Sequence, residues 1–519
     1  MARIGKNVLE SLTRSMYADS RCVYREYIQN AADQIDEAKK EHPEWEYNVF
    51  VTIDQHHGSI TIEDNATGVR AKDVRALLID VARSAKERGV NKGFRGIGRL
   101  GGLAYCKTLK FETSYYNEDK VSVISWDAVR LNKILDDDTD DRDAGEVIDD
   151  ITKVSTEQDK SVKECHYFKV VMEDVTDGKL LIEKDIRDYL SMVSPVDYSN
   201  HFVYRTKIYD FMRAHNLHLD CYNIFVGQNQ LFKDYTMTIY DAGGQECDKV
   251  TGVEFWYEQN AKGKPMYWGW YSVSGLKGVI AKANNARNIR LRCENIQLGD
   301  ESACLRFLPN DKQRFVRWFF GEIHVISSEK LIPNSQRDYL REDDAVREFE
   351  CSVENNFLKL EKLCYQASHL RNEEKTVNIT TKREEELIKK REKGFNSENE
   401  QRKVEAELKD IRKKKTESIK KLQRMKKEMD ENESPLRQLF SPLGLTDPQE
   451  YTLPESNTLF DAPSVTKKED NLRIDKSIYN KFTSQEKKLI ASIYSIIADT
   501  FSNNMGDVLI EKIEKEITK

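Results

Sequence analysis

The sequence lacks several features that would fix its compartment or cofactor class. It has nine cysteines among 519 residues, but no Cys-x-x-Cys pair and no Cys/His cluster, so the usual spacings of zinc sites are absent. Scattered cysteines in an odd number favour free thiols in a reducing compartment, and we expect a cytoplasmic protein. No apolar run approaches the roughly 20 residues of a membrane span. The N-terminus has no signal-peptide core.

A strong charge of one sign is also missing. Lys and Arg total 82 and Asp and Glu total 89, which leaves a net charge of −7. This balance does not indicate a nucleic-acid binder as a whole, although local patches can still bind one. The composition, 33% charged and 39% hydrophobic, is typical of a soluble protein with long polar helices.

One predicted helix, Tyr24 to Asp36, gathers polar groups on one face. Glu26, Asn30 and Asp33 are spaced i, i+4 and i+7, so their side chains project together. Such a carboxylate can orient and deprotonate a water molecule, and an amide oxygen suits Mg²⁺, which favours hard oxygen ligands. A surface helix with a polar outer face has the same pattern, and the helix alone favours that plainer interpretation. Two later stretches reverse this judgement.

The first of these stretches follows a predicted hairpin of strands at 47–53 and 59–63. It is the turn from Asp64 to Gly68, with the sequence DNATG. A carboxylate at the end of a strand can accept a hydrogen bond from a base edge, and small residues beside it let a flat ring approach the backbone. An ordinary Asx turn is the alternative.

The second stretch is glycine-rich and follows a predicted helix at 71–85. Five of the chain's 24 glycines fall within residues 93–102. Such a segment exposes backbone N–H groups to phosphate and can form a lid over bound nucleotide. Gly96-x-Gly98-x-x-Gly101 formally matches the dinucleotide fingerprint. The residues before it are polar where that fingerprint needs a strand, so we exclude a Rossmann fold.

The middle of the chain has a mixed α/β pattern from residue 200 to about 345. Before it, we expect the acidic segment 136–150 to be a solvated loop. Leu331 to Leu340 (LIPNSQRDYL) follows a predicted strand and leads into a helix. An arginine at a loop tip, here Arg337, can reach a phosphate bound by another domain. Taken alone, Arg337 is only a surface arginine.

The C-terminal third has helical periodicity. A heptad seam with two polar positions, broken near Gly394, predicts a helical arm or hairpin. Arg412 to Lys427 carries nine Lys/Arg and one acid and can bind a phosphate backbone; a solvated coiled-coil face is the alternative. A proline-containing linker follows, and then a helical element at 474–517 that is a candidate for dimerisation. The seam residues are Val404, Leu408, Ile411, Lys415, Ser418, Leu422, Met425 and Met429.

The order of these motifs carries a resemblance to a known family. A Glu-x₃-Asn-x₂-Asp helix, an Asp-x₃-Gly turn, a glycine-rich segment and a Pro-Asn-x-x-Arg loop together resemble the GHKL ATPases, most closely the heat-shock-protein-90-like branch and the MORC ATPases. The resemblance covers Ile4 to Tyr339. It implies an α+β fold with a Bergerat-type ATP-binding α/β sandwich, a mixed α/β transducer domain and a long helical, coiled-coil C-terminal region. The expected domains are 1–195 (ATP-binding), 196–345 (transducer-like), 346–432 (helical arm), 433–470 (linker) and 471–519 (C-terminal helices, possible dimerisation).

The resemblance also implies roles for single residues. Glu26 would be the general base that polarises the attacking water, and Asn30 would be the Mg²⁺ ligand. Arg337 would be the γ-phosphate sensor, and Asp64 would accept the adenine amine. The other implied nucleotide-binding residues are Asp33, which lines the site, Gly68 beside the base, Lys86 near the phosphates, and Gly93, Gly96 and Gly98 in the lid.

Two features depart from the family pattern. Ala66 stands where the family has the first glycine of Asp-x-Gly-x-Gly, and alanine fits there only if its φ is negative. The family's Gly-Thr before the last strand is not visible near His166 and Tyr167. The threonine that the family places beside adenine therefore cannot be named from the sequence.

By this resemblance, the protein would be a slow Mg²⁺-dependent ATPase in which ATP closes a homodimeric clamp. Three versions remain open. The clamp acts on DNA through the basic arm Arg412 to Lys427, or the protein is a chaperone for protein clients. In the third version, nucleotide switches a scaffold without significant turnover.

Overall fold

The structure is a computed structural model that describes residues 4–14, 19–80, 98–326, 331–334, 336–431, 434–436 and 512–513. Contacts divide the chain into two units, Met1–Leu453 and Pro454–Lys519. The expected linker at 433–470 and C-terminal element at 471–519 lie almost wholly outside the described residues. Among the helices that are described, none is long and apolar enough to cross a membrane.

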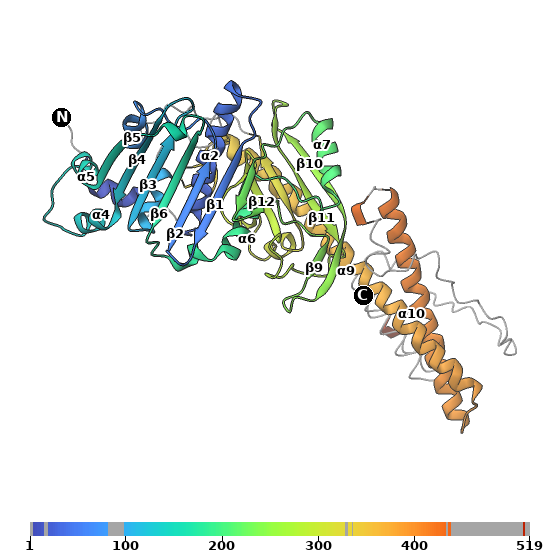
Figure 1. The fold of residues 1–519 in the computed structure, drawn as a ribbon. Coiled ribbons are helices and arrows are strands. Elements are labelled where there is room, and N and C mark those ends of the chain that lie inside the picture. Colours follow the sequence, from blue (N-terminus) through green and yellow to red (C-terminus); the bar gives the residue numbers. More distant parts are fainter. Residues whose placement is uncertain are drawn as a thin grey trace. The chain divides into compact units, whose positions relative to one another are not determined.

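The first sheet has eight strands in the order β5-β4-β3-β6-β2-β1-β7-β8 (Figure 1). Neighbouring strands are antiparallel, except that β1 and β7 are parallel. Alternating apolar residues decide which face is buried, for example Ile60 and Ile62 of β2. The strands are β1 (Asn48–Asp54), β2 (Ser59–Asp64), β3 (Thr108–Ser114), β4 (Lys120–Asp127), β5 (Thr152–Gln158), β6 (Tyr167–Glu173), β7 (Asn223–Val226) and β8 (Asn229–Gln230).

Helix α2 (Cys22–Glu41) packs against this sheet. Tyr24, Ile28 and Ile35 recur at helical spacing, and all three are buried in the same core as the strands. The helix therefore shares the core of the first sheet. The other helices of this region are α1 (Asn7–Leu12), α3 (Val74–Leu78), η1 (Gly98–Ala104), α4 (Ala128–Leu135), α5 (Ala144–Ile151), η2 (Lys160–Val162), η3 (Gly178–Leu181) and α6 (Glu183–Val193).

The expectation of a solvated loop throughout 136–150 is wrong. Helix α5 begins within this segment, at a capping box in which Asp143 accepts from the backbone N–H of Glu146 and Glu146 accepts from that of Asp143. Val147 and Ile151 are buried against the rest of the domain. The acidic composition concealed this local helix signal, because the caps themselves are acidic residues.

The second sheet has six strands in the order β13-β12-β14-β11-β10-β9. It is antiparallel apart from the β12–β14 pair. Its helices are α7 (Arg205–Ala214), η4 (Ala303–Phe307) and α8 (Gln313–Val316). The strands are β9 (Thr238–Tyr240), β10 (Glu246–Gln259), β11 (Pro265–Ser274), β12 (Asn288–Cys293), β13 (Ile296–Gln297) and β14 (Phe320–Val325).

The chain interlocks the two sheets. After α6 it enters the second core through α7, then returns to add β7 and β8 to the edge of the first sheet. These strands lie beyond residue 195, where the sequence analysis placed the end of the ATP-binding domain. The Tyr222 hydroxyl, just before β7, donates to the carboxylate of Asp36 on α2 at 2.7 Å. The first sheet and α2 are therefore held in part by residues that follow α7 in the chain.

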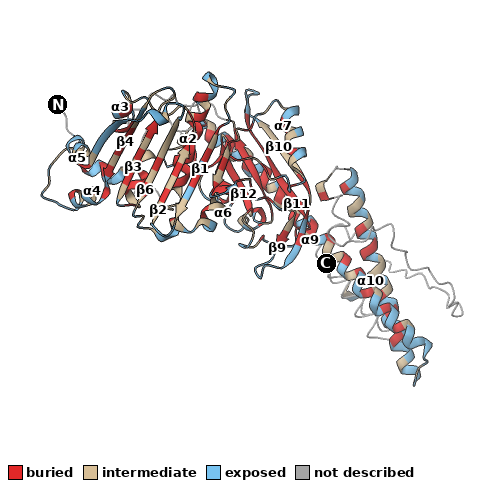
Figure 2. Ribbon diagram, viewed as in Figure 1, coloured by how far each residue is buried: buried red, intermediate tan, exposed pale blue. Residues whose placement is uncertain are grey.

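Two long helices follow the second sheet. Helix α9 (Asp344–Glu392) packs Phe349, Val353 and Phe357 into a third core, separate from the one that α7 enters, and α10 (Glu398–Glu431) folds back along α9. Figure 2 shows buried residues concentrated in the two sheets, whereas the far part of α9 and α10 has a narrow buried seam between exposed faces. The break between the helices falls at 393–397, as the sequence indicated.

Candidate functional site

Three polar residues of α2 were predicted to share one face, and the structure shows how buried they are. Glu26 is 9% exposed and Asp33 is 1% exposed, while Asn30 is partly exposed. Arg25 and Gln29 of the same helix are buried as well. This burial excludes an ordinary solvated helix face, since a carboxylate is removed from water only where other groups compensate it.

The Glu26 carboxylate lies against the start of η1. A Cβ atom placed on Gly98 would lie 2.6 Å from Glu26 Oε2, so a side chain at this position would displace the carboxylate. The hydroxyl of Tyr27 holds the same segment, because it donates to the Arg99 carbonyl and accepts from the Gly102 N–H, both at 3.0 Å. The neighbouring residue of α2 thus fixes η1 where it touches Glu26.

Arg99 ties η1 to the residues on the other side of the glycine-rich segment. Its guanidinium donates to the carbonyl of Leu77 at 2.7 Å and to that of Asp80 at 2.6 Å. Burial lowers the pKa of Arg99 to about 10, so the group remains charged at neutral pH. The predicted lid residues Lys86, Gly93 and Gly96 lie outside the described residues, and of this group only Gly98 is placed.

The Arg337 loop reaches α2 from the second half of the fold. Arg25 Nη2 donates to the Gln336 carbonyl at 3.2 Å, and the same nitrogen lies 3.3 Å from Glu26 Oε1. Arg337 itself is 7% exposed and has a positive φ of 53°, which is uncommon for a residue other than glycine. The sequence did not indicate Arg25, which has no motif of its own.

The Asp64 turn lies at the end of β2. Asp64 is 2% exposed, and its Oδ1 accepts from the Ala66 N–H at 3.1 Å. Ala66 does not have a positive φ, so alanine is accommodated where the family has glycine. Gly68 does have one, 71°, and a Cβ placed there would overlap the Ser114 carbonyl. The Asp64 side chain therefore forms an Asx turn, and position 68 requires glycine.

A threonine that the sequence analysis missed holds this turn. Asp64, Phe168 and Thr113 are paired across β2, β6 and β3, so their side chains share the buried face. Thr113 Oγ1 accepts from the Val69 N–H at 2.9 Å and donates to the Tyr167 carbonyl at 2.8 Å. Thr113 lies on β3, one strand away from Tyr167, and faces the same side of the sheet as Asp64. Cross-strand pairing is its only signal, and a single sequence does not give that pairing.

The donors present suit magnesium better than softer metals. The amide oxygen of Asn30 and the carboxylates of Glu26 and Asp33 are hard oxygen groups. Among the described residues, no group of three or more His, Cys, Asp and Glu could hold a metal ion by itself. A cation here would therefore need oxygens from a bound ligand and water as well, which is how Mg²⁺ is commonly held at nucleotide sites.

Comparison with known proteins finds a match in the part of the chain that carries these residues. Residues 20–176 match the family described as histidine kinase-, DNA gyrase B-, and HSP90-like ATPase. The fold and the matched residues are thus consistent with a GHKL-type ATPase domain of the Hsp90-like kind in this part of the chain. The predicted fold class, a Bergerat-type sandwich followed by mixed α/β structure and long C-terminal helices, is confirmed.

Two similar proteins are both named chaperone protein HtpG. The one from Buchnera aphidicola subsp. Schizaphis graminum is 20% identical over 395 residues, which are 68% of this chain and 55% of that protein. The one from Psychrobacter cryohalolentis is 24% identical over 139 residues, 23% of this chain and 21% of that protein. The chain therefore spans about half the length of the first relative and a fifth of the second.

Proposed function

We propose that the protein hydrolyses ATP in a Mg²⁺-dependent reaction and acts as an ATP-gated homodimeric clamp. The observation that carries this proposal is the position of Glu26. Its carboxylate is buried, touches the first residue of η1 and neighbours the Arg337 loop through Arg25. A carboxylate where a catalytic helix, a glycine segment and a second domain meet is suited to orienting a water for attack on a phosphoryl group.

Each site residue then has one task. Glu26 orients and polarises the attacking water, Asn30 ligates Mg²⁺, and Arg337 stabilises charge on the γ-phosphate. Mg²⁺, when bound, neutralises charge on the phosphate oxygens. Asp64 accepts a hydrogen bond from the adenine amine. The residues proposed to surround the nucleotide are Asp33, Gly68, Lys86, Gly93, Gly96 and Gly98.

Clamp closure requires that ATP bind the closed arrangement more tightly than the open one. The Arg337 loop provides a route for this preference, since the Gln336 carbonyl beside Arg337 accepts a hydrogen bond from Arg25 of α2. An ATP γ-phosphate between α2 and Arg337 would favour this arrangement, and hydrolysis would remove that preference.

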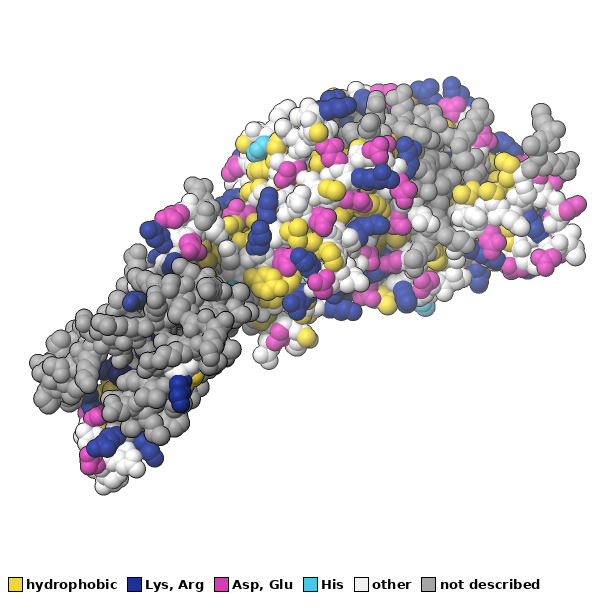
Figure 3. Space-filling model, turned by 180° about the vertical axis from the view of Figure 1, so that it is seen from behind, with side chains coloured by type: hydrophobic (Ala, Val, Ile, Leu, Met, Phe, Trp, Pro, Cys, Tyr) yellow, Lys and Arg dark blue, Asp and Glu magenta, His cyan; other side chains and the backbone are white. Residues whose placement is uncertain are grey.

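The arm bears on whether the clamp acts on DNA or on protein. Ion pairs with neighbouring acids compensate most of the basic stripe. Charges of both signs are also interspersed over the described surface seen in Figure 3. These observations and the names of the two relatives favour a second candidate, a chaperone for protein clients, over a DNA clamp. The paired cations are Arg412, Lys414, Lys415, Lys421, Arg424 and Lys427.

Steady-state ATP hydrolysis by the full chain tests the proposal. We expect slow turnover that Glu26→Ala and Asn30→Ala abolish, while Glu37→Ala, an exposed position on the same helix, leaves it unchanged. Stimulation by DNA would favour the DNA clamp, and ATP-dependent suppression of client aggregation would favour the chaperone. Nucleotide binding without turnover would contradict the ATPase and leave the nucleotide-switched scaffold.

A further inference from the structure

The backbone of the Arg337 loop is fastened to the second sheet at a glycine. The Gly299 N–H, just after β13, donates to the Arg337 carbonyl at 2.9 Å. Gly299 has a φ of 64°, and a Cβ placed there would lie 2.6 Å from the Asp338 carbonyl and 3.0 Å from Ala303 Cβ. The turn and the loop therefore touch at a point that has no room for a side chain.

Two buried polar side chains hold this glycine turn. Gln297 Nε2 donates to the Gly299 carbonyl at 3.1 Å, and Gln297 Oε1 accepts from Arg290 Nη1 at 2.9 Å. Arg290 and Gln297 are 5% and 2% exposed. The Gln297 amide thus donates to the turn through its nitrogen and accepts from Arg290 of β12 through its oxygen. This fixes the turn relative to β12.

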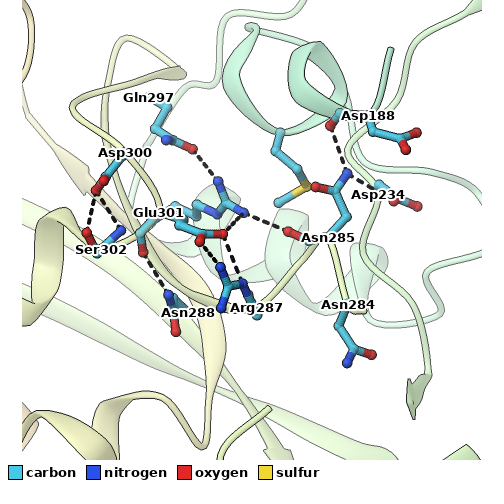
Figure 4. A network of polar contacts seen from close by, with 12 residues as sticks. Asp188, Asp234, Asn284, Asn285, Arg287, Asn288, Gln297, Asp300, Glu301 and Ser302 are labelled. Atoms are coloured by element: carbon cyan, nitrogen blue, oxygen red, sulfur yellow. Dashed lines mark hydrogen bonds and ion pairs between the residues drawn. The ribbon is translucent and has the colours of Figure 1, made fainter. Parts of the chain in front are cut away.

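The same chain of hydrogen bonds continues to α6 (Figure 4). Arg290 Nη2 donates to the Asn285 carbonyl at 2.6 Å. Asn285 Nδ2 in turn donates to the Asp188 carbonyl of α6 at 2.8 Å and lies 3.2 Å from Asp234 Oδ2. A continuous polar path therefore joins a helix of the ATP-binding half to the Arg337 backbone.

We infer that Arg290 and Gln297 are positioning residues that hold the Arg337 loop in the place where it acts on the γ-phosphate. This inference rests on the role proposed for Arg337. Arg337 has a backbone conformation that is unfavourable for its residue type, so the loop needs external contacts to keep it. Arg25 supplies one contact at the Gln336 carbonyl, and Gly299 supplies another at the next residue.

Another polar contact nearby serves as a matched control. The Arg287 guanidinium pairs with the Glu301 carboxylate beside the same turn. No dashed line in Figure 4 joins Arg287 to Gln297, while Glu301 Oε2 also lies 3.9 Å from Arg290 Nη2. Removing the Arg287 pair leaves the hydrogen bonds of Arg290 and Gln297 in place and leaves Glu301 with its longer contact to Arg290.

The test measures kcat, the KM for ATP and the Kd for ADP on full-length Gln297→Met, Gly299→Ala and Arg287→Gln. We expect kcat to fall roughly tenfold or more in the first two, since small misplacements of catalytic groups cost that much, with ADP affinity unchanged. Arg287→Gln should behave as wild type. In an Arg337→Ala background, Gln297→Met should cause no further loss, because it acts through Arg337. If the losses in kcat from Gln297→Met and Arg337→Ala multiply in the double variant, the inference is overturned.

Backbone hydrogen exchange without nucleotide gives a readout that does not need activity. Gln297→Met and Gly299→Ala should speed exchange of the amides of Gly299 and Arg337, and Arg287→Gln should not. Unchanged exchange in the first two variants would overturn the inference even if kcat fell. A wild-type protein without turnover would contradict the proposed ATPase, and the exchange experiment would still decide whether the path holds the loop.

Discussion

Arg25 Nη2 bonds the Gln336 carbonyl at 3.2 Å while it lies 3.3 Å from the Glu26 carboxylate, so one guanidinium nitrogen joins two parts of the chain that are 311 residues apart. The two groups that Arg25 contacts both belong to the proposed active site. Glu26 is the proposed base, and Gln336 precedes the proposed phosphate sensor. A change in the position of the loop must therefore alter the environment of the carboxylate.

Replacing Arg25 by lysine should break the link between Glu26 and the Gln336 carbonyl. An ammonium group keeps the charge but lacks the planar fork, so it does not reproduce the geometry of a shared guanidinium nitrogen. We expect kcat to fall roughly tenfold and ADP affinity to stay within about twofold, as measured by steady-state kinetics and calorimetry. Arg21→Lys is the control, since Arg21 pairs with Asp19 near the exposed start of α2. Equal losses in both variants would argue against a special role for Arg25.

The sequence predicted those site residues whose geometry is local. A helix fixes the relation of Glu26, Asn30 and Asp33, and a turn fixes that of Asp64 and Gly68. These five could be named without any knowledge of the fold. Whether they perform the proposed chemistry stays a prediction.

The residues that were missed depend on contacts made across the fold. Arg25 matters through a loop 311 residues away, and Thr113 through strand pairing with β6. The parallel pairing of β7 with β1 is also a distant relation that no local pattern indicates. Helix α5 was missed for a different reason, since its capping residues look like part of a disordered acidic stretch.

Gly68→Ala should destabilise the ATP-binding domain. The substitution combines a positive φ with overlap between Cβ and the Ser114 carbonyl. We expect a loss of roughly 2–4 kcal/mol in the free energy of unfolding, measured by urea denaturation. Gly178→Ala is the matched control, because a Cβ there meets nothing within 4 Å and φ is not positive. A loss below about 1 kcal/mol would mean that the turn relaxes easily.

Acid should weaken the second sheet through His324. Its Nε2 lies 2.9 Å from Glu322 Oε2, in a buried cluster that also contains Lys233 and Arg292. Burial lowers the pKa of His324 to about 4, whereas the unfolded value is near 6.5. Between these pH values the unfolded chain binds a proton that the folded chain does not. Stability contributed by neutral His324 is therefore present above pH 6.5 and is lost as the pH falls towards 4.

The loss from this residue should reach at most roughly 3 kcal/mol. Urea denaturation at pH 7, 5.5 and 4.5 measures it as the difference between wild type and His324→Gln, which keeps a donor for Glu322 but does not titrate. The variant should show a flatter dependence of stability on pH. His57→Gln, in an exposed turn, should retain the wild-type dependence. Parallel curves for wild type and His324→Gln would contradict the assignment.

A charged layer inside the helical hairpin gives the last prediction. Glu384 of α9 accepts from Arg412 Nε at 2.8 Å and from Lys415 Nζ at 3.0 Å, both on α10. Burial acts to raise the pKa of Glu384, but these two hydrogen bonds lower it overall. This charged layer separates the apolar cluster around Leu387 and Leu408 from the larger core into which the start of α9 packs. It therefore occupies a position in the seam between the helices and can fix their register.

Glu384→Gln keeps the shape of the side chain and removes the charge that two cations share. We expect the opening free energy of the hairpin amides near this layer to fall by roughly 1–2 kcal/mol, measured by hydrogen exchange. Glu386→Gln is the control, because Glu386 is exposed and its single pair with Arg383 is worth about 0.5 kcal/mol or less. Equal effects would mean that the buried layer contributes no more than a surface ion pair. A larger effect at Glu384 would show that Arg412 and Lys415 stabilise the hairpin itself, which is a role that requires no external phosphate.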